Sequence, residues 1–217
     1  MTQESRLILA LDVYGVEKAE DIAKQAEGRV RAIKINWPLV MTSGIGVVQR
    51  LSRYAEVLCD LKIADIPNTN RLITQKVNEM GAWGIITHIF TGSDSLKAVK
   101  EASGEMKVFG VVAMSHPGAS EFMLGFRDRL LALAKEAGLF GIIAPGNNYE
   151  VTKELRSRAG TLKIASPGVG AQGGSASDAI LSGADYIISG RSIYESDNPS
   201  VEMDLINEEI KQAIGLK

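Results

Sequence analysis

The chain has 217 residues, of which 24 are Lys or Arg and 26 are Asp or Glu, and its formal net charge at pH 7 is −2. The chain lacks the excess of basic residues that is typical of proteins that bind nucleic acids or anionic membranes, so neither is expected as its main partner. A small anionic ligand remains possible, because local charge does not show in the net charge. The single cysteine, Cys59, excludes an intramolecular disulfide framework and a cysteine metal cluster, and it favours a reducing compartment.

The first 15 residues, MTQESRLILALDVYG, contain an apolar run of only about five residues, and Asp12 follows that run at once. A secretory signal peptide and a membrane span both need longer apolar segments. We therefore expect a cytoplasmic protein that acts on a small molecule and binds neither membranes nor nucleic acid.

Short apolar runs rich in Val and Ile alternate along the chain with segments of helical period, and no linker or low-complexity stretch separates them. The apolar runs predict eight strands, at residues 7–12, 32–36, 57–62, 84–89, 108–113, 141–144, 162–166 and 186–190. The amphipathic segments predict helices at residues 16–27, 69–80, 126–137, 149–159 and 201–214. We expect residues 1–217 to form a single domain.

This alternation predicts an α/β fold, and eight strand–helix units match a (β/α)8 barrel, or TIM barrel, whose size range begins at about 200 residues. A doubly wound open sheet is the main alternative. It predicts a G-x-G-x-x-G turn after the first strand, and the segment LDVYGVEKAED at that place lacks the motif. The sequence therefore favours the barrel.

Polar residues lie at the ends of the predicted strands, where the active sites of TIM barrels are found. On the first four strands these residues are Asp12, Lys34, Asp60, Lys62 and His88. The later strands are followed by polar or glycine-rich loops at residues 114–118, 145–148, 166–174 and 189–194. His88 and His116 lie near the ends of separate strands without a carboxylate at ligand spacing, so we expect no metal site.

The segment DLKIADIPNTN carries three charges within its first six positions, next to a buried strand. Side chains two apart on a strand share a face, so Asp60 and Lys62 are expected to point into the barrel, opposite Cys59 and Leu61. Burial disfavours a charged lysine, whereas a carboxylate within about 4 to 6 Å favours it. With Lys34 on the adjacent strand, the alternating charges indicate a functional site. An ion network that only holds the loops in place is the structural alternative.

Asp65 lies beyond the end of the third strand, in the loop before Pro67 and a helix cap expected at Asn68 or Thr69. Its carboxylate need not face the cavity of its own subunit. It could face the cavity of a neighbouring subunit instead.

Glycine-rich loops follow the seventh and eighth strands, where TIM barrels commonly bind phosphate through backbone N–H groups. Glycines such as Gly168 and Gly173 allow the backbone to approach an anion closely. Gln172 offers an amide donor and Arg191 a bidentate one. These loops therefore predict a phosphate site, and a tight turn without a ligand is the alternative.

The motifs LALD, KINWP, DLKIADIPNT, MSHPG, SPGVGAQGG and GRSIY occur in this order from the first strand to the eighth. In this combination the chain resembles the orotidine 5'-phosphate decarboxylases in their short archaeal form. The D-x-K-x-x-D pattern alone is shared with related sugar-phosphate decarboxylases and aldolases, and DIPNT together with SPGVGAQGG narrows the resemblance. It implies a TIM barrel enzyme that converts orotidine 5'-phosphate to uridine 5'-phosphate (UMP), the last step of de novo pyrimidine biosynthesis, without a cofactor.

The resemblance also implies roles for single residues. Lys62 would donate a proton to C6 of the pyrimidine as carbon dioxide leaves, and Asp60 would lie beside the departing carboxylate. Lys34 and Asp65 would complete a charged tetrad, with Asp65 supplied by the partner subunit of a homodimer. The implied substrate contacts are Asp12 and Lys34 at the ribose, Ile66 and Thr69 across the subunit interface, Ser115 at the pyrimidine edge, Pro167 in the pocket wall, and Gly168, Gln172, Gly173, Gly190 and Arg191 around the phosphate.

Two other functions remain open at this point. A magnesium-dependent sugar-phosphate decarboxylase or aldolase would keep the D-x-K-x-x-D pattern and the phosphate loops. A non-catalytic phosphoribosyl-binding module would bind a nucleotide without turning it over, although Lys62 and Asp60 argue against that reading.

Overall fold

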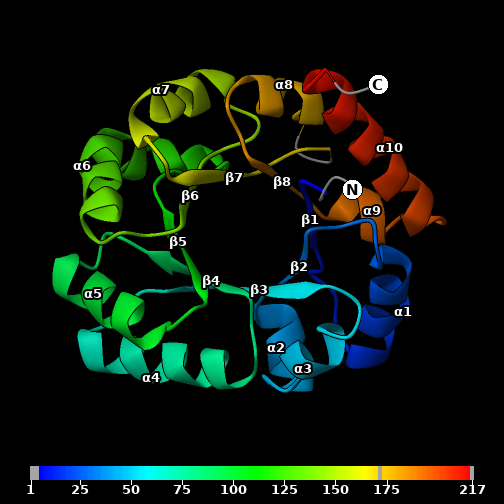
Figure 1. The fold of residues 1–217 in the computed structure, drawn as a ribbon, viewed down its shortest axis with the longest axis horizontal. Coiled ribbons are helices and arrows are strands. Elements are labelled where there is room, and N and C mark those ends of the chain that lie inside the picture. The colour runs from blue at the N-terminus through cyan, green and yellow to red at the C-terminus, as the bar shows by residue number, and fades with distance from the viewer. Residues whose placement is uncertain (1–4, 171–172, 216–217) are drawn as a thin grey trace.

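Eight parallel strands close into a barrel in the computed structural model, which describes residues 5–170 and 173–215. Each strand pairs with its neighbours in the chain, and β8 pairs with β1. Figure 1 looks down the barrel and shows the helices packed around it. The strands are β1 (Leu7–Ala10), β2 (Ala32–Ile35), β3 (Glu56–Ile63), β4 (Gly84–His88), β5 (Lys107–Val111), β6 (Gly141–Ile143), β7 (Lys163–Pro167) and β8 (Tyr186–Ser189).

The connections between the strands carry the helices. They are α1 (Val16–Ala26), α2 (Trp37–Ser43), α3 (Val47–Leu51), α4 (Pro67–Glu79), α5 (Ser93–Ala102), the 3-10 helix η1 (Pro117–Ser120), α6 (Met123–Glu136), α7 (Tyr149–Ala159) and α8 (Ala176–Leu181), and both α9 (Arg191–Tyr194) and α10 (Pro199–Ala213) follow the last strand. Within the described residues, no helix is both long enough and apolar enough to cross a membrane.

The closed parallel barrel confirms the TIM barrel predicted from the sequence, and the strand ends differ from the predicted ones by at most two residues. The expected helix cap at Asn68 or Thr69 is wrong. Helix α4 begins at Pro67, with Ile66 as its N-cap and without a hydrogen bond from a capping side chain. Proline suits this first position because its missing N–H has no partner there in any helix.

Alternate side chains of the strands separate into two apolar layers. In β1, Leu7 and Leu9 belong to the layer between the strands and the helices, whereas Ile8 and Ala10 belong to the layer inside the barrel. The two-residue period of a strand produces this division. The barrel interior is therefore a packed core, and polar side chains can enter it only near a strand end.

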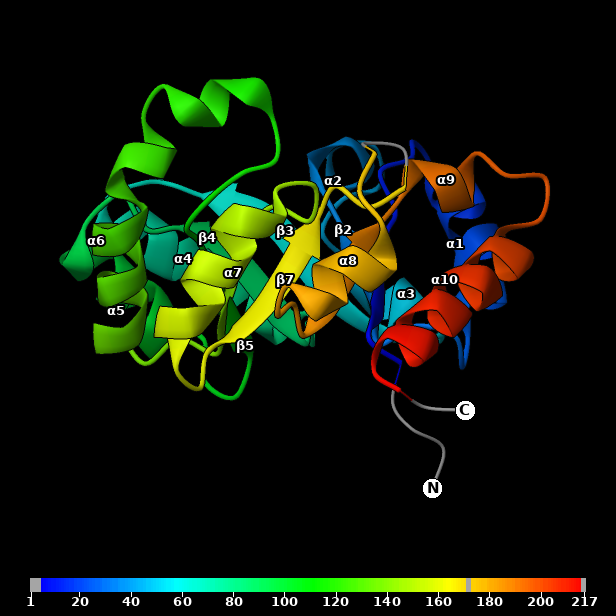
Figure 2. The same ribbon diagram turned by 90° about the horizontal axis from the view of Figure 1, so that it is seen from above.

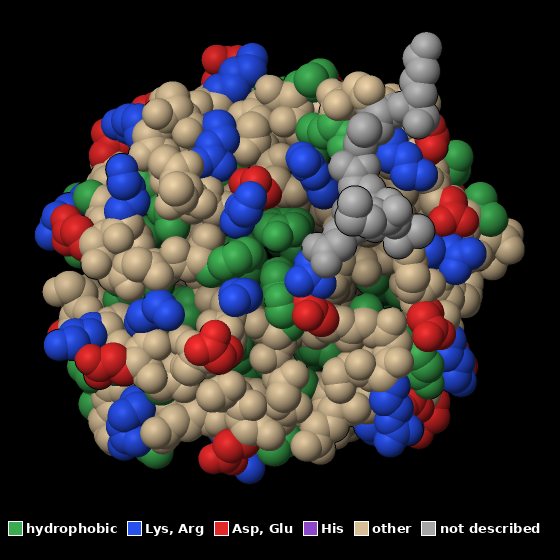
Figure 3. All heavy atoms as spheres, viewed as in Figure 1, with side chains coloured by type: hydrophobic (Ala, Val, Ile, Leu, Met, Phe, Trp, Pro, Cys, Tyr) green, Lys and Arg blue, Asp and Glu red, His purple; other side chains and the backbone are tan. Residues whose placement is uncertain are grey.

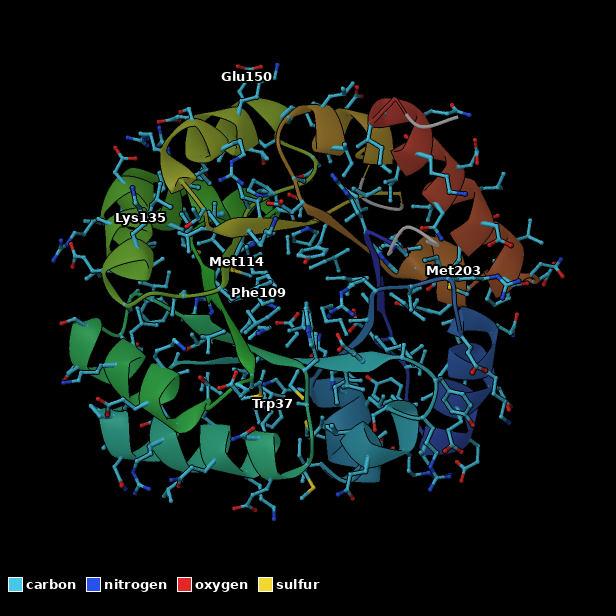
Figure 4. All side chains as sticks on the ribbon, in the orientation of Figure 1. Trp37, Phe109, Met114, Lys135, Glu150 and Met203 are labelled. Carbon is cyan, nitrogen blue, oxygen red and sulfur yellow. The ribbon has the colours of Figure 1, made fainter. Side chains whose placement is uncertain are left out.

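Aromatic side chains fill the end of the barrel at which the strands begin. The ring centroid of Trp83 lies 5.8 Å from that of Phe109, which points into the barrel (Figure 4), and 6.0 Å from that of Phe140. Tyr186 also contacts Trp83, and the guanidinium of Arg31 lies 4.8 Å from the centroid of the Trp83 ring. Figure 3 shows hydrophobic side chains at the centre of this end. Figure 2 shows the end of α10 on this side of the barrel, opposite α2 and α9.

Gly141 lies in β6 at a place where the core leaves no room for a side chain. A Cβ atom there would lie 2.5 Å from the carbonyl oxygen of Lys163 and 2.8 Å from the ring of Phe109. We expect Gly141→Ala to lower the free energy of unfolding by about 1–3 kcal/mol through overpacking. Gly125 in α6 is the matched control, because a Cβ there meets nothing within 4 Å and Gly125→Ala is expected to add about 0.5–1 kcal/mol. Urea unfolding measures both values, and equal stability of the two variants would contradict this packing.

Candidate active site

A cavity of about 220 Å³ opens at the end of the barrel where the strands end. Asp12 follows β1, Lys34 lies in β2, Asp60 and Lys62 lie in β3, and Arg191 begins α9 directly after β8. Because the strands are parallel, their carboxyl ends meet at one rim, and side chains that are distant in the sequence converge there.

Four charged side chains form a continuous chain of ion pairs in this cavity. The ammonium nitrogen (Nζ) of Lys62 lies 2.7 Å from Oδ1 of Asp60. Nζ of Lys34 lies 3.0 Å from Oδ2 of the same carboxylate and 3.3 Å from Oδ1 of Asp12. In the order Asp12, Lys34, Asp60 and Lys62, each charge therefore has neighbours of opposite sign.

The two central members of the chain are buried, since Lys34 is 4% and Asp60 is 6% exposed. Burial by itself disfavours the ammonium form of Lys34, but the carboxylates of Asp60 and Asp12 outweigh it and raise the pKa of Lys34. Burial likewise disfavours the carboxylate form of Asp60, but Lys34 and Lys62 outweigh it and lower the pKa of Asp60. Both groups are therefore charged at neutral pH.

Lys62 occupies a strained stretch of backbone. Its φ is 42°, and in residues 5–170 and 173–215 it is the only non-glycine residue with a positive φ. The register between β3 and β4 shifts between Cys59 and Ile63, the segment that contains Lys62. A left-handed conformation costs a residue with a side chain about 1–2 kcal/mol. Strain of this kind gathers at functional sites, where the surrounding structure holds it in place.

The residues between the charged ones face away from the cavity, as the alternation of the strand predicts. Cys59 and Leu61 belong to the layer between the strands and the helices. Burial raises the pKa of the Cys59 thiol to about 12. Cys59 is therefore a small buried apolar residue, and its thiol stays protonated at neutral pH.

His88 ends β4 beside the charged group, and its ring centroid lies 4.8 Å from that of Phe90. Burial, together with the positive charge of Lys62, lowers the pKa of His88 and keeps its imidazole neutral at pH 7. Among the described residues, no group of three or more His, Cys, Asp or Glu side chains is arranged to hold a metal ion.

The loop after β7 folds back on itself at the cavity wall. The N–H of Gly170 donates to the carbonyl oxygen of Gly174, and the N–H of Gly174 donates to that of Gly168, at 2.8 and 3.1 Å. A Cβ at position 174 would lie 2.6 Å from the carbonyl oxygen of Gly168 and 2.8 Å from that of Gly146. Only glycine fits at Gly174, so the described ends of this loop pack as closely as backbone allows.

The structure brings most of the predicted site residues together around the cavity: Asp12, Lys34, Asp60, Lys62, Ser115, Pro167, Gly168, Gly190 and Arg191. Four others are not part of its wall. Asp65 and Ile66 are exposed in the loop before α4, Thr69 is half-buried in the first turn of α4, and Gly173 is exposed. Gln172, predicted to bind the phosphate, lies outside the described residues.

The loop that carries Asp65 is held firmly although the carboxylate is exposed. The backbone carbonyl oxygen of Asp65 accepts a hydrogen bond from Nδ2 of Asn70, at 3.0 Å, and another from Oγ of Ser95. Oδ1 of Asp65 accepts from the N–H of Ile66 at 2.7 Å. The loop therefore presents this carboxylate outward in a defined position.

Eight residues of the cavity wall were absent from the predicted site. Four are apolar residues of the strands, Ala10, Ile86, Ile143 and Ile188, and four lie beyond strand ends, Asn36, Met114, Val169 and Tyr194. A signal for Asn36 was present, because it follows Lys34 by two positions and so shares its face. Tyr194 lies three positions after Arg191 on α9, a spacing that places side chains on the same side of a helix. Met114 and Val169 lie in loops after β5 and β7, where no periodic pattern marks a direction.

Chemically, the cavity joins two kinds of group. Lys62 offers an ammonium that can donate a proton and stabilise a developing negative charge. Arg191 and the neighbouring glycines offer donors suited to a phosphate or a similar anion. A substrate that fits both must carry an anionic group at a distance from its reacting atom.

Comparisons with known proteins agree with this geometry. A family model described as "Orotidine 5'-phosphate decarboxylase / HUMPS family" matches residues 5–206. The orotidine 5'-phosphate decarboxylase of Thermoplasma acidophilum is 50% identical over 211 residues, which cover 97% of this chain and 98% of that protein. That of Thermococcus kodakarensis is 50% identical over 215 residues, which cover 98% of this chain and 100% of that protein.

Solved structures give the same result. The crystal structure of orotidine 5'-phosphate decarboxylase from Pyrococcus horikoshii OT3 matches with a TM-score of 0.89 and 48% identity, over 94% of this chain and 99% of that one. The orotidine 5'-monophosphate decarboxylase from Methanocaldococcus jannaschii, complexed with the inhibitor BMP, matches with a TM-score of 0.91 and 38% identity, over 96% and 99% of the two chains.

Proposed function

Because the chain belongs to the orotidine 5'-phosphate decarboxylase / HUMPS family, we propose that it decarboxylates orotidine 5'-phosphate to UMP. This reaction is the last step of de novo pyrimidine biosynthesis, and we assign it to the cytoplasm. The observation that carries the proposal is the chain of ion pairs from Asp12 to Lys62, which places a fixed ammonium beside a carboxylate in the same cavity as Arg191.

The chemistry requires such an ammonium. When the bond between C6 and the carboxylate breaks, its electron pair stays on C6, and the ring offers no electron sink for it. The site must therefore stabilise a negative charge that is absent from C6 in the substrate. In our proposal the ammonium of Lys62 provides this stabilisation and then transfers a proton to C6, and one proton taken up from the solvent restores the ammonium. No metal or cofactor takes part.

Asp60 and Lys34 prepare Lys62 for this step. The carboxylate of Asp60 holds Nζ of Lys62 at 2.7 Å and lies, in our proposal, beside the carboxylate that leaves as carbon dioxide. Lys34 keeps Asp60 ionised from its other side. These charges are fixed before the substrate binds, so little reorganisation is needed when charge develops in the transition state.

The remaining residues bind the substrate at a distance from C6. We assign the ribose hydroxyls to Asp12 and Lys34, the pyrimidine edge to Ser115 and the pocket wall to Pro167. We assign phosphate binding to the loops after β7 and β8, and within them to Gly168, Gln172, Gly173, Gly190 and Arg191. Binding energy from a remote phosphate can order the site around the reacting carbon.

Asp65, Ile66 and Thr69 complete the site of a partner subunit in our proposal, so the enzyme acts as a homodimer. The outward position of Asp65 and Ile66 supports this assignment, since neither residue lines the described cavity of its own chain. A second carboxylate beside Lys62 would finish the tetrad of Lys34, Asp60, Lys62 and Asp65.

Loss of the ultraviolet absorbance of orotidine 5'-phosphate tests the proposal directly. We expect rapid loss in the presence of excess EDTA, because the proposed reaction needs no metal. A reaction that requires added magnesium and ignores the pyrimidine would assign the chain to the sugar-phosphate enzymes of the same family. Tight binding of UMP without turnover would instead identify a non-catalytic phosphoribosyl-binding module.

A further inference from the structure

Ser175 lies where the loop after β7 ends and α8 begins, and it is held from two other helices. Its N–H donates a 2.9 Å hydrogen bond to the hydroxyl oxygen of Tyr149, the first residue of α7. Its Oγ donates a 2.7 Å hydrogen bond to Oε1 of Glu209 on α10, and the same Oε1 accepts from the N–H of Ser177 at 2.9 Å. Ser175 also caps α8 by accepting from the N–H of Asp178.

These contacts lie directly after the residues proposed to face the phosphate. Gly174 precedes Ser175 and packs against the carbonyl oxygens of Gly168 and Gly146, so close that a Cβ would lie within 2.9 Å of both. The other end of the loop is tied by the N–H of Gly146, which donates to the carbonyl oxygen of Pro167 at 2.6 Å. A shift of Ser175 therefore disturbs the close packing of Gly174 against the carbonyl oxygens of Gly168 and Gly146.

We propose that Tyr149 and Glu209 are positioning residues for the phosphate: they act through Ser175 and fix the backbone of Gly173 and Gly174. This inference rests on the proposed function, because it assumes that the loop after β7 binds the 5'-phosphate. Neither residue belongs to the described cavity wall, so in our proposal both act through Ser175 and not by contact with the substrate.

Because Glu209 is negatively charged, its substitution distinguishes a positioning role from a direct electrostatic effect on the phosphate. A carboxylate near an anion site repels the anion, so its removal would strengthen phosphate binding if charge alone mattered. If Glu209 works through Ser175, its removal weakens phosphate binding instead. Glu209→Gln keeps an oxygen that can accept from Ser175 and Ser177, whereas Glu209→Ala keeps none.

The test compares the affinities of UMP and of uridine, which lacks the phosphate, by titration calorimetry or by inhibition of decarboxylation. We expect Tyr149→Phe and Glu209→Ala to weaken UMP binding about five- to tenfold each, with uridine binding unchanged. Glu209→Gln should restore most of the loss. In kinetics, KM for orotidine 5'-phosphate should rise by a similar factor with a smaller change in kcat.

Glu208→Gln and Tyr54→Phe are the matched controls. Glu208 is the exposed neighbour of Glu209 on α10, and Tyr54 lies between α3 and β3, away from the loop. Both control variants should bind UMP as the wild type does. Unchanged UMP affinity in Tyr149→Phe and Glu209→Ala, or tighter binding in both Glu209 variants, would overturn the inference. Absence of turnover in the wild-type enzyme would overturn the proposed function instead.

Discussion

Lys62→Ala is expected to reduce the rate of orotidine 5'-phosphate decarboxylation about 10⁴-fold or more, because it removes the proton donor and the charge that faces the developing carbanion. Each factor of ten corresponds to about 1.36 kcal/mol in the activation barrier, so the loss amounts to about 5 kcal/mol or more. The rate constant under saturating substrate measures this loss, since binding through the phosphate is left in place.

The fold should survive this substitution. The side chain of Lys62 is 31% exposed, and Asp60 keeps its ion pair with Lys34 at 3.0 Å when Lys62 is gone. No buried carboxylate is left without a cation. Thermal unfolding should therefore change little, and Lys76→Ala, which removes an exposed lysine of α4, is the matched control for the loss of a lysine. A Lys62→Ala enzyme that keeps a tenth of the wild-type rate would remove Lys62 from the proposed mechanism.

The sequence predicted the barrel and one face of the site because both follow from short-range geometry. The two-residue period of β3 places Asp60 and Lys62 on one face and Cys59 on the other, and the structure has this arrangement. Strand order and closure followed from the number of repeated units. These features need no knowledge of how loops fold.

Several features that the sequence did not predict depend on loops and on strain. Tyr194 reaches the cavity because α9 starts immediately after β8, and Met114 reaches it through the turn that follows β5. The left-handed φ of Lys62 could not be predicted, since no local pattern requires it and it falls where the register between β3 and β4 shifts. The start of α4 at Pro67 was missed because a helix can begin without a capping side chain.

The site has two parts, a charged centre on the strands and the loops that follow the strands. The strands fix Asp60 and Lys34 in the interior, where their ionisation depends on each other. In our proposal the loops supply the groups that contact the distant parts of the substrate, and the hydrogen bonds of Ser175 to Tyr149 and Glu209 hold the end of the loop after β7. If the proposal holds, substitutions at these loop anchors should alter the binding of the phosphate without altering the ion pairs.

Asp65→Ala is the second substitution with a large expected effect, about 10²- to 10³-fold in kcat/KM, because in our proposal it removes a carboxylate beside Lys62 of the partner subunit. Its exposed position in its own chain makes a stability effect small. A loss of rate without a loss of stability is therefore expected for a residue that acts across the subunit interface. An unchanged rate would remove Asp65 from the tetrad.

Mixed dimers distinguish action across the interface from action within one subunit. A dimer of one Lys62→Ala subunit and one Asp65→Ala subunit has one site with both residues intact if Asp65 acts on its partner, because Lys62 of one chain then meets Asp65 of the other. Such dimers, isolated with two different affinity tags, should recover about half of the wild-type rate per dimer, although each parent keeps about a hundredth of that rate or less. If Asp65 acted within its own chain, both sites of the mixed dimer would lack a residue and no activity would return. Recovery therefore requires that a complete site contain residues of two chains, and it would account for the position of Asp65 outside the cavity of a single chain.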